Sequence, residues 1–172
     1  GRLDVCMNAA GILAFGSVGD TDDETWSRVL AVNLTGTFNV CRAAVRAMKA
    51  GGGGAIVNVS TGLALQPSAV NVDYTAAKAA LMALAKALAE EFGPQGIRVN
   101  GICPGPVRTA WWTDDGGAAD IFAAETGTDR ETVLERLAPE MMQLHTGRLI
   151  EPREIADAVL LLASPRSGST TG

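Results

Sequence analysis

The sequence of 172 residues predicts an α/β fold, a partial doubly wound, Rossmann-like domain with a parallel sheet and helices on both faces. Two observations predict it. Short apolar segments alternate along the chain with long segments of helical periodicity, which is the order of repeated strand–helix units. The apolar segments also lack a regular alternation of apolar and polar residues, as expected for strands that are covered on both faces.

The predicted strands are three short segments, residues 4–8 ("DVCMN"), 55–60 ("AIVNVS") and 97–102 ("IRVNGI"). Ligands of doubly wound folds bind beyond the carboxyl ends of the strands, and the crossovers are right-handed. Functional residues are therefore expected just after each strand, at residues 8–11, 60–62 and 104–109.

Three helices are predicted, over residues 22–50, 72–92 and 152–163. Thr21 or Asp22 can cap the first helix, along which apolar residues recur at helical spacing. Gly93 and Pro94 end the second helix, and a proline opens the third in its first turn, where proline is tolerated.

Residues 110–149 break this rhythm, and we expect loops and short helices that face the substrate, within a single domain over residues 1–172. The segment contains six large apolar side chains: Trp111, Trp112, Ile121, Phe122, Met141 and Met142. They either form an apolar lid or pack the short helices together, and the sequence leaves both interpretations open.

Composition excludes several functional classes. The net charge of −5 argues against nucleic acid, and no apolar run is long enough to span a membrane. A single histidine, His145, makes a histidine-based metal site improbable. The three cysteines are scattered, without CxxC spacing, and no secretion signal is present. We therefore expect a cytoplasmic protein that acts on small molecules.

Tyr74 and Lys78, in "YTAAK", lie four residues apart and share one face of the second predicted helix. A free phenol has a pKa of about 10 and is a poor base at neutral pH. A fixed ammonium group nearby favours the phenolate and lowers that pKa. Tyr74 can then exchange a proton with a substrate oxygen, while Lys78 donates hydrogen bonds to a hydroxylated ligand.

Three further motifs follow the predicted strands. In "NAAG" (8–11), small residues let a planar group approach the backbone, and the Asn8 side chain can tie two strand ends together. In "NVSTG" (58–62), Ser60 and Thr61 both offer a hydroxyl to a substrate oxygen. In "CPGPVRT" (103–109), two prolines and a glycine redirect the chain away from the third strand. Taken singly, each motif is also explained as an ordinary turn.

In combination these motifs make the chain similar to the short-chain dehydrogenase/reductase family. The matching segments are residues 4–11 ("DVCMNAAG"), 32–36 ("VNLTG"), 56–61 ("IVNVST"), 74–78 ("YTAAK"), 97–109 ("IRVNGICPGPVRT") and 147–164 ("GRLIEPREIADAVLLLAS"). The resemblance covers nearly the whole chain except about 110–146. It implies an oxidoreductase that transfers hydride between NAD or NADP and an alcohol or ketone.

The resemblance implies a catalytic set of four residues. Tyr74 would be the general acid/base, and Lys78 would bind the nicotinamide ribose and lower the pKa of the tyrosine. Thr61 stands where the family usually has serine and would orient the substrate oxygen, unless Ser60 points inward and takes that role. The backbone of Asn33 would hold a water molecule that relays protons to Lys78.

The resemblance also implies contacts outside this set. The cofactor would contact Asn8, Ala9, Gly11, Tyr74, Lys78, Pro104, Gly105, Val107 and Thr109. The substrate would contact Thr61, Ser60 and Trp111. Family members commonly assemble into dimers or tetramers through two long helices, which correspond here to residues 22–50 and 72–92.

One part of the family pattern is missing from these residues. No Gly-rich phosphate-binding turn occurs, and "GGGG" (51–54) is no substitute because it precedes a strand instead of opening a helix. We therefore expect that the N-terminal strand–helix units and the last strand of the family fold lie outside this chain. The isolated chain would then bind NAD or NADP weakly, and its first strand would be an apolar edge.

An alternative function is a non-catalytic subunit or binding module with the same fold. The intact set of Asn33, Thr61, Tyr74 and Lys78 argues against it, since a scaffold needs none of them. The motifs of α/β hydrolases and P-loop enzymes are absent.

Overall fold

The computed structural model describes residues 1–172, which form two compact units. The first unit consists of Gly1–Cys103 and Ala158–Gly172, and it holds the sheet and the long helices. The second unit is Pro104–Asp157, which contains the predicted lid segment 110–149 and residues on either side of it.

The sheet of the first unit has three parallel strands in the order β1-β2-β3. Their bounds are Val5–Asn8, Gly54–Val59 and Ile97–Ile102. The predicted α/β class and all three predicted strands are confirmed. In the register, Asn8 is opposite Asn58 and Val59 is opposite Ile102, so the carboxyl ends of the strands meet at one edge of the sheet.

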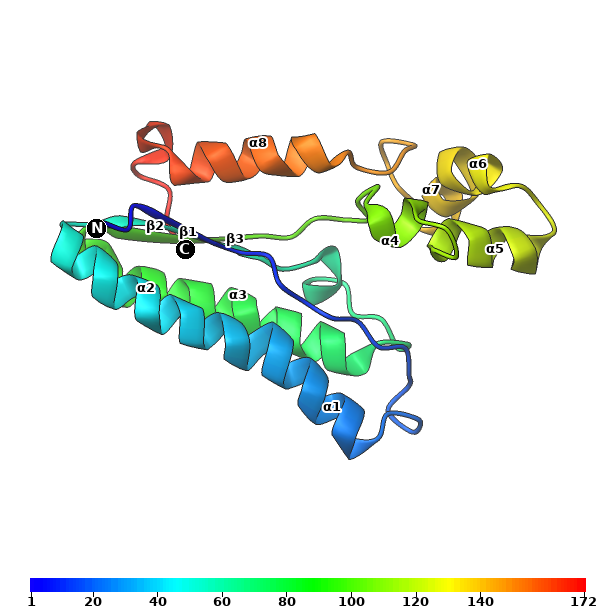
Figure 1. The fold of residues 1–172 in the computed structure, drawn as a ribbon, viewed down its shortest axis with the longest axis horizontal. Coiled ribbons are helices and arrows are strands. Elements are labelled where there is room, and N and C mark those ends of the chain that lie inside the picture. Colours follow the sequence, from blue (N-terminus) through cyan, green and yellow to red (C-terminus); the bar gives the residue numbers. More distant parts are fainter. The chain divides into compact units, whose positions relative to one another are not determined.

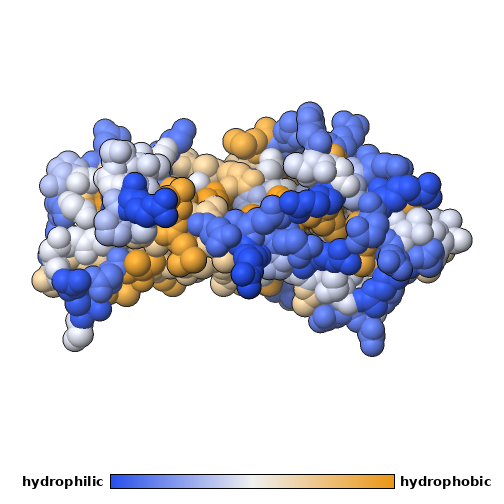
Figure 2. All heavy atoms as spheres, turned by 90° about the horizontal axis from the view of Figure 1, so that it is seen from above, coloured by the Kyte–Doolittle hydropathy of each residue, from blue (hydrophilic) through white to orange (hydrophobic).

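The middle strand β2 is buried along most of its length, whereas β1 is an edge strand with exposed Val5 and Met7. An apolar edge strand was predicted, and the structure confirms it. Figure 2 views the side of the molecule that carries α8 (Pro152–Ala163) and shows apolar surface there. Leu160 and Leu161 of α8 are exposed.

The helix predicted over residues 22–50 is one continuous helical stretch in three parts: α1 (Asp23–Leu30), η1 (Ala31–Gly36) and α2 (Thr37–Gly51). Asp22 caps it, accepting a hydrogen bond from the Thr25 backbone N–H at 2.7 Å. The middle part, η1, is a wider π-helical turn, which the periodicity of the sequence did not indicate. Such turns occur often at functional sites, and Asn33 lies within this one.

The second long helix, α3 (Val72–Phe92), has the predicted bounds. It packs together with α2 on one face of the sheet, while the carboxyl-terminal half of α8 lies on the other side (Figure 1). Side chains from α2, α3 and the strands form the main core, which includes Cys41, Val45, Met48, Ile56, Leu88, Phe92, Ile97 and Val99. The layered arrangement predicted from the sequence is thus present in the first unit.

The second unit has a small core of its own, formed by short helices: α4 (Ala110–Thr113), α5 (Ala118–Thr126), α6 (Arg130–Thr132), the π-helical η4 (Val133–Leu137) and α7 (Ala138–Met141). Trp112 is buried in this core, with its ring 6.0 Å from that of Phe122. Trp111, Ile121, Met141 and Met142 are exposed. The six apolar residues of this segment therefore divide, since two pack inward and four face outward.

Arg98 of β3 joins the sheet to the last turn of α8. Its guanidinium group donates hydrogen bonds to the carbonyl oxygens of Leu162 at 2.6 Å and Ser164 at 3.1 Å, and to the Ser167 hydroxyl at 3.1 Å. The carbonyl groups at a helix end lack partners within the helix, so this side chain acts as a cap.

We predict that Arg98→Met lowers the free energy of unfolding by about 1–3 kcal/mol, because it removes charge-assisted hydrogen bonds to partly buried carbonyl groups. Urea unfolding followed by circular dichroism measures this change. The matched control is Arg46→Met at an exposed position of α2, expected to stay within about 0.5 kcal/mol of the parent. Equal effects of the two substitutions would contradict the capping role.

Candidate active site

Tyr74 and Lys78 lie one turn apart at the start of α3. The Lys78 Nζ atom is 5.7 Å from the centre of the Tyr74 ring, so both side chains lie on the same side of the helix. The Asp73 carboxylate accepts a hydrogen bond from the Tyr74 backbone N–H at 2.6 Å, within the first turn, where negative charge is favourable. Asp73 was not singled out in the sequence, although an acidic residue in a first turn is a recognisable signal.

Two hydrogen bonds tie Lys78 to the end of β2. The Lys78 ammonium group donates to the Val59 carbonyl oxygen at 2.9 Å, and the Ser60 hydroxyl donates to the Lys78 carbonyl oxygen at 2.8 Å. Lys78 is only 4% exposed, and this burial lowers the pKa of its ammonium group. An ammonium group has three N–H donors, so two remain for a ligand.

The sequence left open whether Ser60 or Thr61 presents its hydroxyl to the substrate. Ser60 is buried and its hydroxyl is already bonded to the Lys78 backbone. The Thr61 side chain is partly exposed and close enough to the Tyr74 phenol to lower its pKa. The geometry therefore favours Thr61 for this role.

The sequence predicted a lowered pKa for Tyr74, with Lys78 as the cause, but the pKa is raised in the structure, so the predicted net direction is wrong. Burial of the phenol raises the pKa of Tyr74, and the nearby Thr61 side chain offsets only part of that increase. The physical reason is that a half-buried phenolate loses its hydration. Tyr74 is therefore protonated at neutral pH and is prepared to donate a proton.

Asn33 is completely buried and belongs to the π-helical turn η1. Its Nδ2 atom donates to the carbonyl oxygens of Ile12 at 2.8 Å and Val29 at 3.0 Å. Its own backbone carbonyl oxygen accepts a hydrogen bond from the Thr37 hydroxyl at 3.1 Å. The Asn33 Oδ1 atom is buried and has no partner. The water-binding role of the Asn33 backbone stays a prediction.

Gly11 brings the loop after β1 against both Asn33 and Lys78. A Cβ atom at this position would lie 2.7 Å from Asn33 Oδ1 and 3.4 Å from Lys78 Nζ. The position is therefore closely packed, and the loop can approach Asn33 and Lys78 this closely because Gly11 has no side chain. That the small residues of "NAAG" admit a planar group stays a prediction.

Asn8 ties two strand ends together, as predicted. Its Nδ2 atom donates to the Asn58 Oδ1 atom at 2.8 Å and contacts the Cys41 sulfur atom at 3.4 Å. Asn58 is buried and was not identified in the sequence. In the sequence, Asn58 could have been found as the asparagine two residues before Ser60. In the parallel register it lies opposite Asn8.

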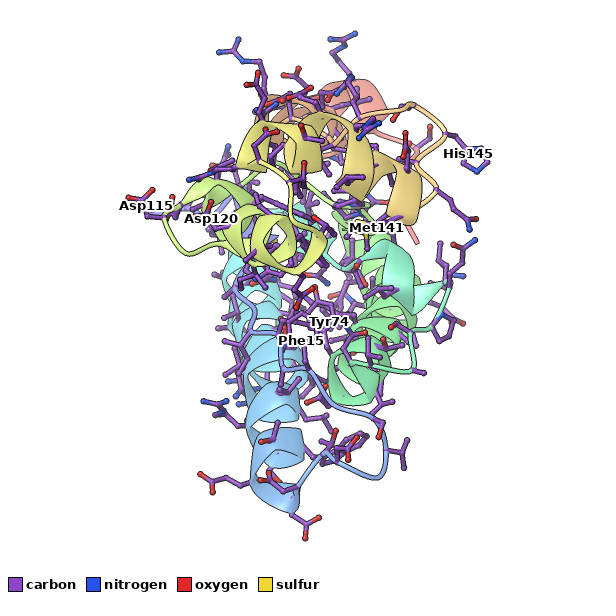
Figure 3. The ribbon with its side chains drawn as sticks, turned by 90° about the vertical axis from the view of Figure 1, so that its right-hand side faces the viewer. Phe15, Tyr74, Asp115, Asp120, Met141 and His145 are labelled. Atoms are coloured by element: carbon purple, nitrogen blue, oxygen red, sulfur yellow. The ribbon has the colours of Figure 1, made fainter.

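The remaining predicted site residues, Pro104, Gly105, Val107, Thr109 and Trp111, belong to the second unit. Val107 pairs with Ile150 in a short parallel bridge, and the Thr109 carbonyl oxygen accepts the backbone N–H of Trp112 at 2.8 Å as α4 begins. Their contacts with a cofactor or substrate stay predictions. Figure 3 shows His145 of this unit pointing outward, and no cluster of three potential metal ligands is present.

The first unit suits a hydroxyl-bearing ligand such as the ribose of a nicotinamide cofactor. Lys78 has two N–H donors beyond the one bonded to Val59, and such donors fit hydroxyl oxygens. The Asn33 Oδ1 atom is buried and lies against Gly11.

The sequence matches the family described as enoyl-(acyl carrier protein) reductase over residues 1–172. It is also 40% identical, over its full length, to 3-alpha-(or 20-beta)-hydroxysteroid dehydrogenase of Mycobacterium tuberculosis. The chain belongs to the short-chain dehydrogenase/reductase family. The resemblance noted in the sequence is thereby confirmed.

Other members of the short-chain dehydrogenase/reductase family are also similar to the whole chain. It is 38% identical to "Inactive 2-(S)-hydroxypropyl-CoM dehydrogenase 2" of Xanthobacter autotrophicus and 40% identical to an uncharacterized NAD-dependent oxidoreductase of M. tuberculosis. The chain spans 70% of the first relative's length, 58% of the hydroxysteroid dehydrogenase and 60% of the NAD-dependent oxidoreductase. None of the helices is both long and apolar enough to cross a membrane.

We predict that Tyr74 titrates above pH 10 in the folded chain without cofactor, because burial disfavours the phenolate. Tyr74 is the only tyrosine of the 172 residues, so the ultraviolet absorbance of the phenolate reports on it alone. Thr61→Val should raise the pKa further, and the chain unfolded in urea, with a value near 10, is the reference. A folded-state value below that of the unfolded chain would contradict the assignment.

We predict that Gly11→Ala lowers the free energy of unfolding by about 1–3 kcal/mol, because the added Cβ overlaps Asn33 Oδ1. Gly19→Ala is the matched control, since the nearest atom to its Cβ is the Ser17 hydroxyl oxygen at 3.8 Å. Urea unfolding of both variants tests the close packing, and a neutral Gly11→Ala would refute it.

Proposed function

We propose that the whole protein containing this chain transfers hydride between NAD or NADP and an alcohol or ketone, with Tyr74 as general acid/base. One observation carries the proposal: Tyr74 lies beside the buried ammonium group of Lys78 where the strands end, with the Thr61 side chain close enough to lower the pKa of the phenol. Relatives named as dehydrogenases and NAD-dependent oxidoreductases support the reaction class.

In the direction of ketone reduction, the hydroxyl groups of Thr61 and Tyr74 hold the carbonyl oxygen. The nicotinamide, when bound, supplies the hydride. Tyr74 gives its proton to the developing alkoxide, and the raised pKa of Tyr74 keeps that proton in place at neutral pH. Thr61 keeps the oxygen in line with Tyr74 through its own hydroxyl.

The phenolate that remains on Tyr74 then lies close to the positive charge of Lys78. An opposite charge at this distance stabilises the phenolate in a partly buried site, and this attraction opposes the effect of burial. In the direction of alcohol oxidation, Tyr74 must first lose its proton. Oxidation should therefore become faster as the pH rises towards the pKa of Tyr74, while reduction is favoured below it.

Lys78 also has a binding role in this proposal. Its two remaining N–H donors would hold the ribose hydroxyl groups, with Asn33 Oδ1 as an acceptor nearby. Gly11 would admit the ribose because it has no side chain. Pro104, Gly105, Val107 and Thr109 would contact the nicotinamide, and Trp111 the substrate, as the family resemblance implies.

We further propose that the protein is a homo-oligomer that associates through the helices α1, α2 and α3. Large apolar side chains on α1, η1 and α2 are exposed, namely Trp26, Val32, Phe38 and Val40. The alanine-rich α3 permits close approach of a partner helix.

A cytoplasmic location is also proposed, and the three free cysteines support it.

A second candidate is a non-catalytic subunit, which the relative named as inactive makes worth testing. The two candidates differ in one measurement, turnover of NAD or NADP by the whole protein with an alcohol or ketone.

We predict that Tyr74→Phe in the whole protein lowers kcat by about 100-fold or more and leaves the Kd of the cofactor nearly unchanged, because only proton transfer is removed. Thr61→Ser retains the hydroxyl and should stay active, whereas Thr61→Val should not. Lys78→Met should weaken cofactor binding. Retained turnover in Tyr74→Phe would refute the role of Tyr74.

A further inference from the structure

We propose that the substrate is an uncharged alcohol or ketone with an apolar body, which rests on Leu13, Phe15, Leu65 and Val70. These four residues are called the apolar rim below. The inference rests on the proposed function, because it takes Tyr74 and Thr61 as the groups that hold the reacting oxygen.

The apolar rim comes from two loops that are joined to each other. The loop after β1 carries Leu13 and Phe15, and the loop after β2 carries Leu65 and Val70. The Gly16 backbone N–H donates to the Val70 carbonyl oxygen at 2.8 Å, and Gly16 also forms a bridge with Asn71. The two loops therefore lie side by side.

Both loops also lie next to Tyr74. Val70 and Asn71 lead directly into α3, whose first turn contains Tyr74. The short helix η2 (Gly62–Ala64), which follows Thr61 and precedes Leu65, packs against α3. Phe15 precedes Gly16, whose bond to Val70 brings the loop after β1 to the residues that lead into α3; Figure 3 labels both Phe15 and Tyr74.

The side chains of the apolar rim are large and face solvent. Phe15 is 69% exposed and Leu65 is 70% exposed, and Val70 and Leu13 are exposed as well. Single exposed apolar residues are ordinary, but several of them on two joined loops that adjoin Thr61 and Tyr74 indicate a binding surface. An apolar substrate would cover these side chains while its oxygen reaches Thr61 and Tyr74.

The charges of the two loops restrict the class of substrate. Residues 11–19 and 61–72 contain no lysine, arginine, histidine, aspartate or glutamate. The nearby cation is Lys78, which is buried and bonded to Val59. A carboxylate or phosphate on the substrate would lose hydration against the apolar rim and find no opposite charge there. The two loops therefore favour an uncharged substrate body.

The test uses the whole protein and two cyclohexanones that differ only opposite the carbonyl group, one with a tert-butyl substituent and one with a carboxylate. We expect kcat/KM with NADH or NADPH to be at least about tenfold higher for the tert-butyl ketone. Calorimetry with the two corresponding alcohols measures binding without turnover and should give the same preference.

Phe15→Ser and Leu65→Ser should each lower kcat/KM and affinity for the tert-butyl probes about tenfold, and leave unsubstituted cyclohexanone within about threefold. Leu160→Ser on α8 is the matched control, since Leu160 is 66% exposed and lies outside both loops. Leu160→Ser should change neither kcat/KM nor affinity for the tert-butyl probes.

The outcomes separate this inference from the proposed function. A preference for the carboxylate probes overturns the substrate class and leaves the oxidoreductase assignment intact. If Phe15→Ser and Leu65→Ser weaken binding of the tert-butyl probes but no probe is turned over, the apolar rim is a binding surface and the proposed function is overturned. A change of oligomeric state in Phe15→Ser or Leu65→Ser, with unchanged probe binding and kcat/KM, assigns the rim to a protein contact and overturns the inference.

Discussion

The arrangement of the candidate site depends on the pair of hydrogen bonds between Lys78 and the end of β2. The ammonium group of Lys78 donates to the Val59 carbonyl oxygen, and the Ser60 hydroxyl donates to the Lys78 carbonyl oxygen. The bond from the charged ammonium group contributes about 1.5–3 kcal/mol and the bond from the neutral hydroxyl about 0.5–1.5 kcal/mol. This pair therefore fixes the first turns of α3 against the strand that leads to Thr61.

The same pair explains the electrostatics of the free site. Lys78 has given one of its donors to a backbone carbonyl oxygen and is itself desolvated, and the phenol of Tyr74 is half-buried. Both groups therefore favour their neutral forms more than they would in water. A catalytic tyrosine in this state holds a proton to donate, and the Thr61 hydroxyl moderates the effect. Gly11 lets the loop after β1 pack closely against Asn33 Oδ1 and the ammonium group.

Much of the fold was predictable because periodicity and capping are local. The α3 and α8 helices and β3 have the predicted bounds, and Asp22 caps the first long helix. The π-helical turn around Asn33 was not predictable, since one widened turn barely alters the spacing of apolar residues. The pKa of Tyr74 was predicted with the wrong sign because burial depends on packing between segments distant in the sequence. The choice between Ser60 and Thr61 likewise required the position of the Lys78 carbonyl oxygen.

The most direct test of the account is a crystal structure of the whole protein with a nicotinamide cofactor and a slowly reacting alcohol. The account predicts that the alcohol oxygen lies within about 3 Å of the hydroxyl oxygens of both Tyr74 and Thr61. It also predicts a ribose hydroxyl within hydrogen-bonding distance of Lys78 Nζ. An alcohol bound elsewhere, or held by Ser60 in place of Thr61, would contradict the account.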